Sequence, residues 1–199
     1  MSDFVTAYVT EPDLLAAHAR LTAEAGALIE ATPASAYGDP TPCGDWDVRR
    51  VICHLAELNE VWGRFAATRE EAEVDPDYPD PVAAFRQWAA YAAEAVAVPG
   101  YLDEVRPTPI GEQPGRVLVQ HLVNEMIAHA WDLARATGAS TDLSPDIAER
   151  SEASWRAFFA AFPREAMSFN FGPETLGGGR AAADWTAADR LAAHLGRDV

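Results

Sequence analysis

Apolar residues recur at helical spacing along most of the chain. Leu14, Leu21, Ala25 and Leu28 lie on one face of a 3.6-residue helix, which predicts a first helix of about 20 residues. The segment Thr10–Asp13 directly before it has the form of a capping box, with a proline early in the first turn. We therefore expect this helix to begin within that segment.

A second helix is expected after a turn-rich interruption. Gly38–Gly44 contains the prolines and glycines that break a helical pattern. Asp47 is suited to cap the helix that follows, because its carboxylate can accept hydrogen bonds from the backbone N–H groups of the first turn. The inward stripe of this helix comprises Val51, His54, Leu55, Leu58, Trp62 and Phe65.

The region after the second helix is interrupted twice. Glu70–Pro81 is acidic and rich in proline, which is typical of a solvated connector, and a further helix is expected to begin at Pro81. Pro99–Gly115 is again rich in proline and glycine. We expect it to be a loop, with extended backbone around Tyr101–Val105.

The longest helix is expected over Arg116–Thr137, where Gly138 stands at the position of a C-terminal cap. Ser144-Pro145 begins another helix, whose apolar residues are mostly aromatic. A glycine-rich irregular segment, Met167–Ala183, follows it. Thr186 then caps a short final helix.

These patterns predict an all-α fold with a single domain over residues 1–199 and a short C-terminal tail. Four substantial helices indicate a four-helix bundle with a long connection between the second and third bundle helices, the third being the one that begins at Arg116. There is no βαβ alternation and no internal repeat.

Composition and charge narrow the possible partners. The chain has 31 acidic and 15 basic residues, for a formal net charge of -16. Such a field repels phosphate backbones and anionic lipid, so we expect no nucleic-acid partner and no membrane partner. No apolar stretch is long enough to span a bilayer, and Met1–Thr10 lacks the basic start of a secretory signal. Two cysteines, Cys43 and Cys53, cannot form a disulfide framework, which favours the cytoplasm.

Candidate chemistry lies on the longest helix. Glu125 and His129 are four residues apart, so they lie about 40° apart around the helix and one turn along it. A carboxylate oxygen and an imidazole nitrogen at that spacing can converge on one ion, with a third ligand from another helix. His54 on the inward stripe of the second helix is the best candidate. The alternatives are a buried structural histidine at 54 and a solvated pair on the helix face at 125 and 129.

Other residues on the same helix could support this site. His121 lies one turn before Glu125 and could be a fourth ligand, a partner of Glu125 or a partly exposed histidine; we favour the last two. Asp132 could accept the second N–H of His129, or pair with Arg135 or Arg116 at the surface. Trp46 and Trp131 are near the candidate ligands and could line a pocket. His18 and His194 have no partner at metal spacing, and we expect both to be structural.

Two segments carry a resemblance to a known family. Residues 41–55 (TPCGDWDVRRVICHL) and 124–134 (NEMIAHAWDLA) resemble segments of the mycothiol-dependent maleylpyruvate isomerase N-terminal domain family, which belongs to the DinB-like metalloprotein superfamily. The ending, residues 189–198, is similar to that of uncharacterised actinobacterial members. The resemblance spans roughly residues 10–198.

The resemblance implies a DinB-like four-helix bundle that holds a divalent metal, commonly zinc, with nickel or another divalent ion as alternatives. It maps the ligands to His54, Glu125 and His129, with water completing the shell. It further implies a low-molecular-weight thiol such as mycothiol as cosubstrate, a small electrophile as second substrate, isomerase or S-transferase activity, and a homodimer. The isomerase itself carries a further C-terminal domain, whereas a short tail follows the Phe-rich helix here, so we favour thiol transfer.

Three functional hypotheses therefore stay open. The first is a metal-dependent enzyme that activates a thiol for transfer to an electrophile or for its isomerisation. The second is a metal-binding or small-ligand-binding bundle without turnover. The third is a helical dimerisation module in which the three candidate ligands form a buried hydrogen-bonded cluster. Neither cysteine is expected to be the nucleophile: a packed thiol is the favoured interpretation of both Cys43 and Cys53.

Overall fold

The structure is a computed structural model that describes residues 2–68, 73–108, 110–167, 171–175 and 184–199. Within those residues it is mostly helical. The α-helices are α1 (Ser2–Tyr8), α2 (Leu14–Ala31), α3 (Val48–Thr68), α4 (Pro81–Val96), α5 (Gly115–Thr137), α6 (Pro145–Ala161) and α7 (Ala187–His194); the short 3-10 turns are η1 (Ala34–Ala36), η2 (Tyr101–Asp103) and η3 (Arg164–Met167); the strands are β1 (Val105–Thr108) and β2 (Gly111–Pro114).

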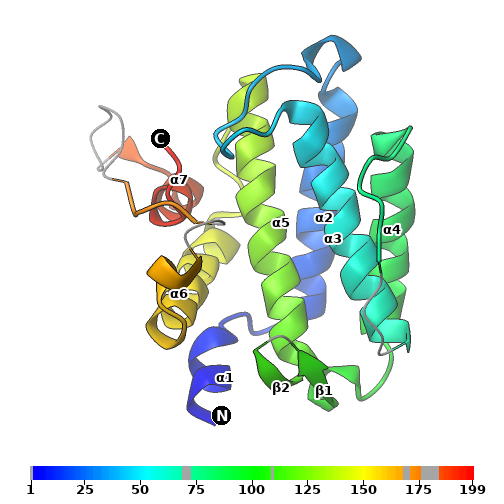
Figure 1. Cartoon of the computed structure of the whole chain (residues 1–199), viewed down its shortest axis with the longest axis vertical. Coiled ribbons are helices and arrows are strands. Elements are labelled where there is room, and N and C mark those ends of the chain that lie inside the picture. The colour runs from blue at the N-terminus through cyan, green and yellow to red at the C-terminus, as the bar shows by residue number, and fades with distance from the viewer. Residues whose placement is uncertain (1, 69–72, 109, 168–170, 176–183) are drawn as a thin grey trace.

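Helix α5 runs through the middle of the molecule (Figure 1). Helices α2, α3 and α4 lie on one side of it and form the bundle with it: α3 packs against α4 and α5, and α2 packs against α5 and α4. Helices α1, α6 and α7 lie on the other side, where α6 contacts α1, α7 and α5. The expected all-α bundle is confirmed. The stretch between α3 and α5 adds a bundle helix of its own, α4.

The helix starts follow the expected capping chemistry with one correction. The carboxylates of Asp47 and Asp80 accept hydrogen bonds from backbone N–H groups in the first turns of α3 and α4. Thr186 forms a capping box with Asp189 at the start of α7. The capping box expected at Thr10–Asp13 is wrong, because Asp13 itself is the N-cap of α2 and accepts from the N–H of Ala16.

The segment expected to be a loop before α5 contains a hairpin. Strands β1 and β2 pair antiparallel from Val105 opposite Pro114 to Thr108 opposite Gly111. The backbone expected to be extended, Tyr101–Val105, is mostly the 3-10 turn η2. Helix α1 was also not expected from the sequence. The connector at 70–81 and the glycine-rich segment at 167–183 fall partly outside the described residues, and their described parts have no strand.

Helices α3 and α4 pack closely at Gly63. A Cβ placed on this glycine would lie 2.9 Å from a ring carbon of Tyr91 and 3.0 Å from the backbone of Ala92. Close approach of the two helices therefore requires a residue without a side chain.

None of the described helices is both long enough and apolar enough to cross a lipid bilayer.

We predict that Gly63→Ala lowers the free energy of unfolding by about 1–3 kcal/mol, because the added methyl group overpacks the contact between α3 and α4. Thermal denaturation measures this. Gly26→Ala in α2 is the matched control, since its Cβ would meet the ring of Phe85 at an ordinary 3.6 Å. The control is expected to leave stability unchanged or to raise it by up to about 1 kcal/mol. Equal stabilisation by both changes would contradict the prediction.

Candidate functional site

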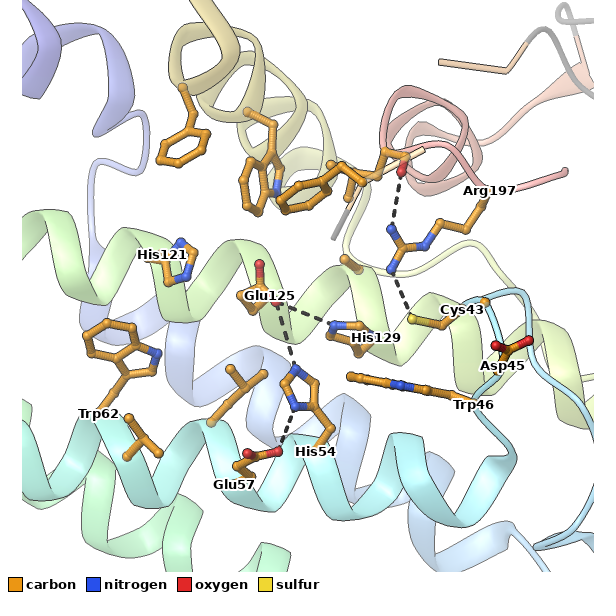
Figure 2. A pocket seen from close by; sticks show the side chains of 18 residues that line it. Cys43, Asp45, Trp46, His54, Glu57, Trp62, His121, Glu125, His129 and Arg197 are labelled. Atoms are coloured by element: carbon orange, nitrogen blue, oxygen red, sulfur yellow. Dashed lines mark hydrogen bonds and ion pairs between the residues drawn. The ribbon is translucent and has the colours of Figure 1, made fainter. Parts of the chain in front are cut away.

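The structure brings together the side chains of His54, Glu125 and His129. His54 projects from α3, and the other two project from α5 (Figure 2). Oε2 of Glu125 lies 4.0 Å from Nε2 of His54 and 3.4 Å from Nε2 of His129. One ligand atom of each residue lies within 4.8 Å of the other two. The spacing argument and the geometry thus select the same three residues.

These distances suit a small divalent cation. Zinc bonds of about 2.0–2.2 Å place neighbouring ligand atoms of a tetrahedral shell about 3.4 Å apart. The pair Glu125 and His129 already has that separation, 3.4 Å between Nε2 and Oε2, and His54 is only slightly further away. Two imidazoles and one carboxylate are also a donor set that zinc accepts. The residues present therefore fit the metal that the resemblance implies.

Each histidine is oriented by a second carboxylate. Nδ1 of His54 lies 2.9 Å from Oε2 of Glu57, and Nδ1 of His129 lies 3.0 Å from Oδ2 of Asp132. Each Nδ1–H can donate to its carboxylate, which turns both Nε2 atoms toward Glu125. Metal-binding histidines commonly have this kind of partner, which sets the tautomer and the ring orientation. Of the two partners weighed for Asp132, the structure shows the contact with His129.

Charge interactions outweigh burial at this site in the metal-free protein. Burial opposes ionisation of Glu125, but hydrogen bonds with His129 and His54 hold the pKa of its carboxyl well below the usual value. Burial also opposes the charged form of His129, but hydrogen bonds with Asp132, Cys43 and Glu125 raise its pKa well above the usual value. A proton is therefore held between His129 and Glu125, and a cation binding there would displace it.

The three residues line a cavity of about 730 Å³. Its walls come from segments far apart in the sequence: the loop before α3, helices α3, α5 and α6, and the C-terminal segment after α7 (Figure 2). The described lining residues are Cys43, Gly44, Asp45, Trp46, His54, Glu57, Leu58, Val61, Trp62, His121, Glu125, Ala128, His129, Trp155, Phe158, Phe171, Leu195 and Arg197.

The chain resembles known proteins over most of its length. Residues 14–134 match the family described as mycothiol maleylpyruvate isomerase N-terminal domain, and that span is more than half of the 199 residues. The chain belongs to this family. Two Mycobacterium tuberculosis proteins described as uncharacterised, from strains CDC 1551 / Oshkosh and H37Rv, are each 38% identical to this chain in an alignment of 194 residues. Each alignment covers 94% of this chain and 99% of the relative. No solved structure matches the chain.

Trp46 and Trp131 were both expected to line a pocket. Trp46 lines the cavity, and Trp131 does not. Its ring stacks on the imidazole of His129 at 5.5 Å and meets that of His54 edge-on at 4.7 Å, while the guanidinium of Arg50 covers it at 4.6 Å. Trp131 is the exception to the prediction. It is fully buried and donates to Asp189 on α7, because its position on α5 faces the core.

His121 lines the cavity but does not join the three candidate ligands. Its Nδ1 lies 3.1 Å from the hydroxyl of Tyr8, and its ring meets Trp62 and Trp155 edge-on. Burial lowers its pKa below the usual value. The described contacts of the ring are with Tyr8 and the aromatic rings, so the structure shows no hydrogen bond between His121 and Glu125.

Sequence reasoning missed Glu57 and Arg197. Glu57 stands three residues after His54, a helical spacing that could have identified it. Arg197 lies near the C-terminus, and no spacing relates it to α5. Its guanidinium donates to the buried carboxylate of Asp132 at 3.0 and 3.2 Å. Burial lowers the pKa of Arg197, but the attraction of Asp132 is stronger and raises that pKa above the usual value. The charge of Arg197 is thereby neutralised.

The two cysteines differ in their surroundings. Cys43 lines the cavity, and its sulfur lies 3.6 Å from the guanidinium of Arg197. Cys43, His129 and Asp132 also have ligand atoms within 4.8 Å of one another. In that set, however, Asp132 already binds both the imidazole and Arg197, so the set with His54 and Glu125 is better suited to a cation. Cys53 is buried, and burial raises its pKa, so it is a packed thiol.

The remaining two histidines lie away from the described walls of the cavity. His18 is buried in the bundle, where Nε2 lies 3.0 Å from Oδ1 of Asn59. His194 is buried on α7 against the ring of Phe159, with Nδ1 3.3 Å from a carboxylate oxygen of Glu174. Both positions agree with the structural role that was expected.

We predict that His54→Ala sharply lowers zinc content in protein purified without a histidine tag, because it removes the ligand that α3 supplies. His121→Ala should lower zinc content only mildly, since its imidazole is bonded to Tyr8 and lies outside the ligand set. Elemental analysis after zinc loading compares the two. Equal loss in both variants would overturn the ligand assignment. If the wild-type protein takes up no zinc, the result would support the third hypothesis, in which the three candidate ligands form a hydrogen-bonded structural cluster.

Glu57→Gln should weaken zinc affinity by about 10–100-fold without removing any ligand, because the Nδ1–H of His54 loses its carboxylate partner. Titration against a fluorescent zinc chelator measures the change. Glu30→Gln is the matched control, since Glu30 is an exposed residue of α2 that pairs with Arg86. Unchanged affinity in Glu57→Gln would mean that this hydrogen bond does not prepare the site.

Proposed function

We propose that this chain is a metal-dependent enzyme that binds a low-molecular-weight thiol at a divalent cation and transfers it to a small electrophile. The single observation that carries the proposal is the convergence of two Nε2 atoms on Glu125, with each Nδ1 held by a carboxylate. This arrangement leaves ligand atoms facing a cavity rather than the protein core. A site open on one side is what a catalytic metal requires.

A cation held by His54, Glu125 and His129 would lower the pKa of a thiol that coordinates it, so that a nucleophile forms near neutral pH. The protein's own residues provide the surroundings of that reaction. Trp46 covers the two imidazoles and keeps water from that side of the site. Glu57 and Asp132 hold the imidazole protons at Nδ1.

Mycothiol is the thiol that we propose, since the family is described by its use. The cavity of about 730 Å³ has room for a small-molecule thiol beside an electrophile. We propose S-transfer rather than isomerisation as the reaction. Zinc is the proposed metal because of the donor set of two histidines and one glutamate.

We also propose a cellular compartment and an oligomeric state for the enzyme. The two cysteines are both free, in agreement with a reducing compartment, and we propose the cytoplasm. We also propose a homodimer, which the family resemblance implies. Size-exclusion chromatography with light scattering tests the dimer.

We predict that zinc-loaded protein consumes mycothiol in the presence of a suitable electrophile faster than the uncatalysed reaction does. The loss of free thiol, followed over a panel of electrophiles, measures this. His129→Ala should abolish the acceleration, since it removes one ligand, whereas Glu30→Gln should retain it. Full zinc loading without thiol consumption by any electrophile would support the alternative function, a metal-binding or ligand-binding bundle without turnover.

A further inference from the structure

One end of the cavity is aromatic and carries a polar group of its own. His121 lies on α5 one turn before Glu125, so it is about 6 Å nearer the N-terminus of the helix than that candidate ligand. Figure 2 shows Trp62 beside its ring, and the centroids of the two rings are 5.6 Å apart. The ring of Trp155 lies at 5.8 Å. In the described part of the chain, Nε2 of His121 has no hydrogen-bond partner, while the ring lines the cavity.

The position of the proton on this ring follows from a chain of hydrogen bonds that begins at two backbone groups. The N–H groups of Thr10 and Glu11 both lie 3.0 Å from Oε1 of Gln120, and an N–H group can only donate. The oxygen of the Gln120 amide therefore faces the backbone. Its nitrogen donates to Oδ1 of Asn124 at 2.8 Å, so Asn124 must use its own nitrogen for its remaining contacts.

The amide nitrogen of Asn124 donates hydrogen bonds to two oxygens. One is Oγ of Ser154 at 2.8 Å, and the other is the hydroxyl oxygen of Tyr8 at 3.4 Å. The hydroxyl proton of Ser154 is used on the backbone oxygen of Tyr8, 2.6 Å away. The Tyr8 hydroxyl, whose pKa is raised by burial, thus keeps its own proton to donate, and Nδ1 of His121 lies 3.1 Å from it.

An imidazole that accepts at Nδ1 carries its proton at Nε2. We propose that the Nε2–H of His121 is a fixed hydrogen-bond donor that binds an acceptor oxygen of the second substrate, an uncharged aromatic carbonyl compound. Tyr8 and Asn124 are positioning residues for this donor. The proposal rests on the proposed function only in naming the bound compound as the electrophile.

The walls around His121 support an uncharged aromatic compound. Trp62, Trp155, Phe158 and Phe171 offer ring faces and edges, against which a flat compound packs favourably. Among the described lining residues Arg197 is the one arginine or lysine, and it is bound to Asp132. His129 is likewise paired, with Asp132 and Glu125. In the metal-free protein a carboxylate compound would therefore meet no unpaired cation there, and the acidic lining residues Asp45, Glu57 and Glu125 would repel it.

Binding to metal-free protein without thiol tests the donor independently of any reaction. Two probes of similar shape are compared by quenching of tryptophan fluorescence: benzylacetone, a saturated aromatic ketone, and butylbenzene, which has no acceptor oxygen. Wild-type protein should bind the ketone more tightly. His121→Phe should weaken ketone binding by about tenfold or more and leave butylbenzene binding intact, because it replaces the donor by an apolar ring.

His121→Gln should restore part of the ketone preference, since its amide nitrogen can donate from a similar position. No ketone binding by the wild type, or an equal preference for the two probes in wild type and His121→Phe, would overturn the proposal. Because metal and thiol are absent from this experiment, a protein without transferase activity would still give the expected result.

The tautomer is tested by NMR of protein that carries ¹⁵N-labelled histidine, with the His121 signals identified from their loss in His121→Phe. Nε2 should be protonated and Nδ1 unprotonated in the wild type. Tyr8→Phe should disturb this pattern and weaken ketone binding, whereas Tyr91→Phe, at a half-buried position of α4 outside the cavity lining, should change neither. A wild-type ring protonated at Nδ1 would overturn the proposal without any variant.

Discussion

Two hydrogen bonds between an imidazole and a carboxylate, one on α3 and one on α5, fix the orientation of the two candidate histidine ligands. Without Glu57 and Asp132, the rings of His54 and His129 could rotate, and either nitrogen of each could face the cavity. With them, both Nε2 atoms are turned toward Glu125. The donor geometry therefore exists before any cation binds, so little ordering remains to oppose binding.

Asp132 also connects the site to the end of the chain. Its fully buried carboxylate binds His129 with one oxygen and is bound by Arg197 through both. A buried carboxylate is stable only when it is paired, so the C-terminal segment completes the site electrically as well as sterically. This pairing also explains why Arg197 lines the cavity without offering a free positive charge.

The cavity combines two environments along α5. The end at His129 holds charged and ligand-forming groups beneath Trp46, and the end at His121 is enclosed by aromatic rings. One helical turn separates Glu125, which belongs to the first, from His121, which belongs to the second. In the proposed function, the group that binds the nucleophile and the apolar region that binds the electrophile would lie next to each other on one rigid helix.

Much of this protein was accessible from local sequence patterns. Helical periodicity located the main helices, and the spacing of Glu125 and His129 identified a candidate ligand pair, because both signals depend on residues within a few turns. Local patterns misplaced the cap at Asp13 and missed the hairpin before α5. A cap depends on which residue first turns into the helix, and a hairpin depends on pairing between strands, neither of which periodicity records.

The sequence by itself therefore determined the helices and the candidate ligands, since these follow from contacts near in the chain. Only the tertiary structure decided which groups surround them. It placed Arg197 against Asp132, buried Trp131 away from the cavity, and joined Tyr8 to His121 across 113 positions. Such contacts arise when α1, α6, α7 and the C-terminal segment pack on the far side of α5, and no short spacing along the chain encodes them.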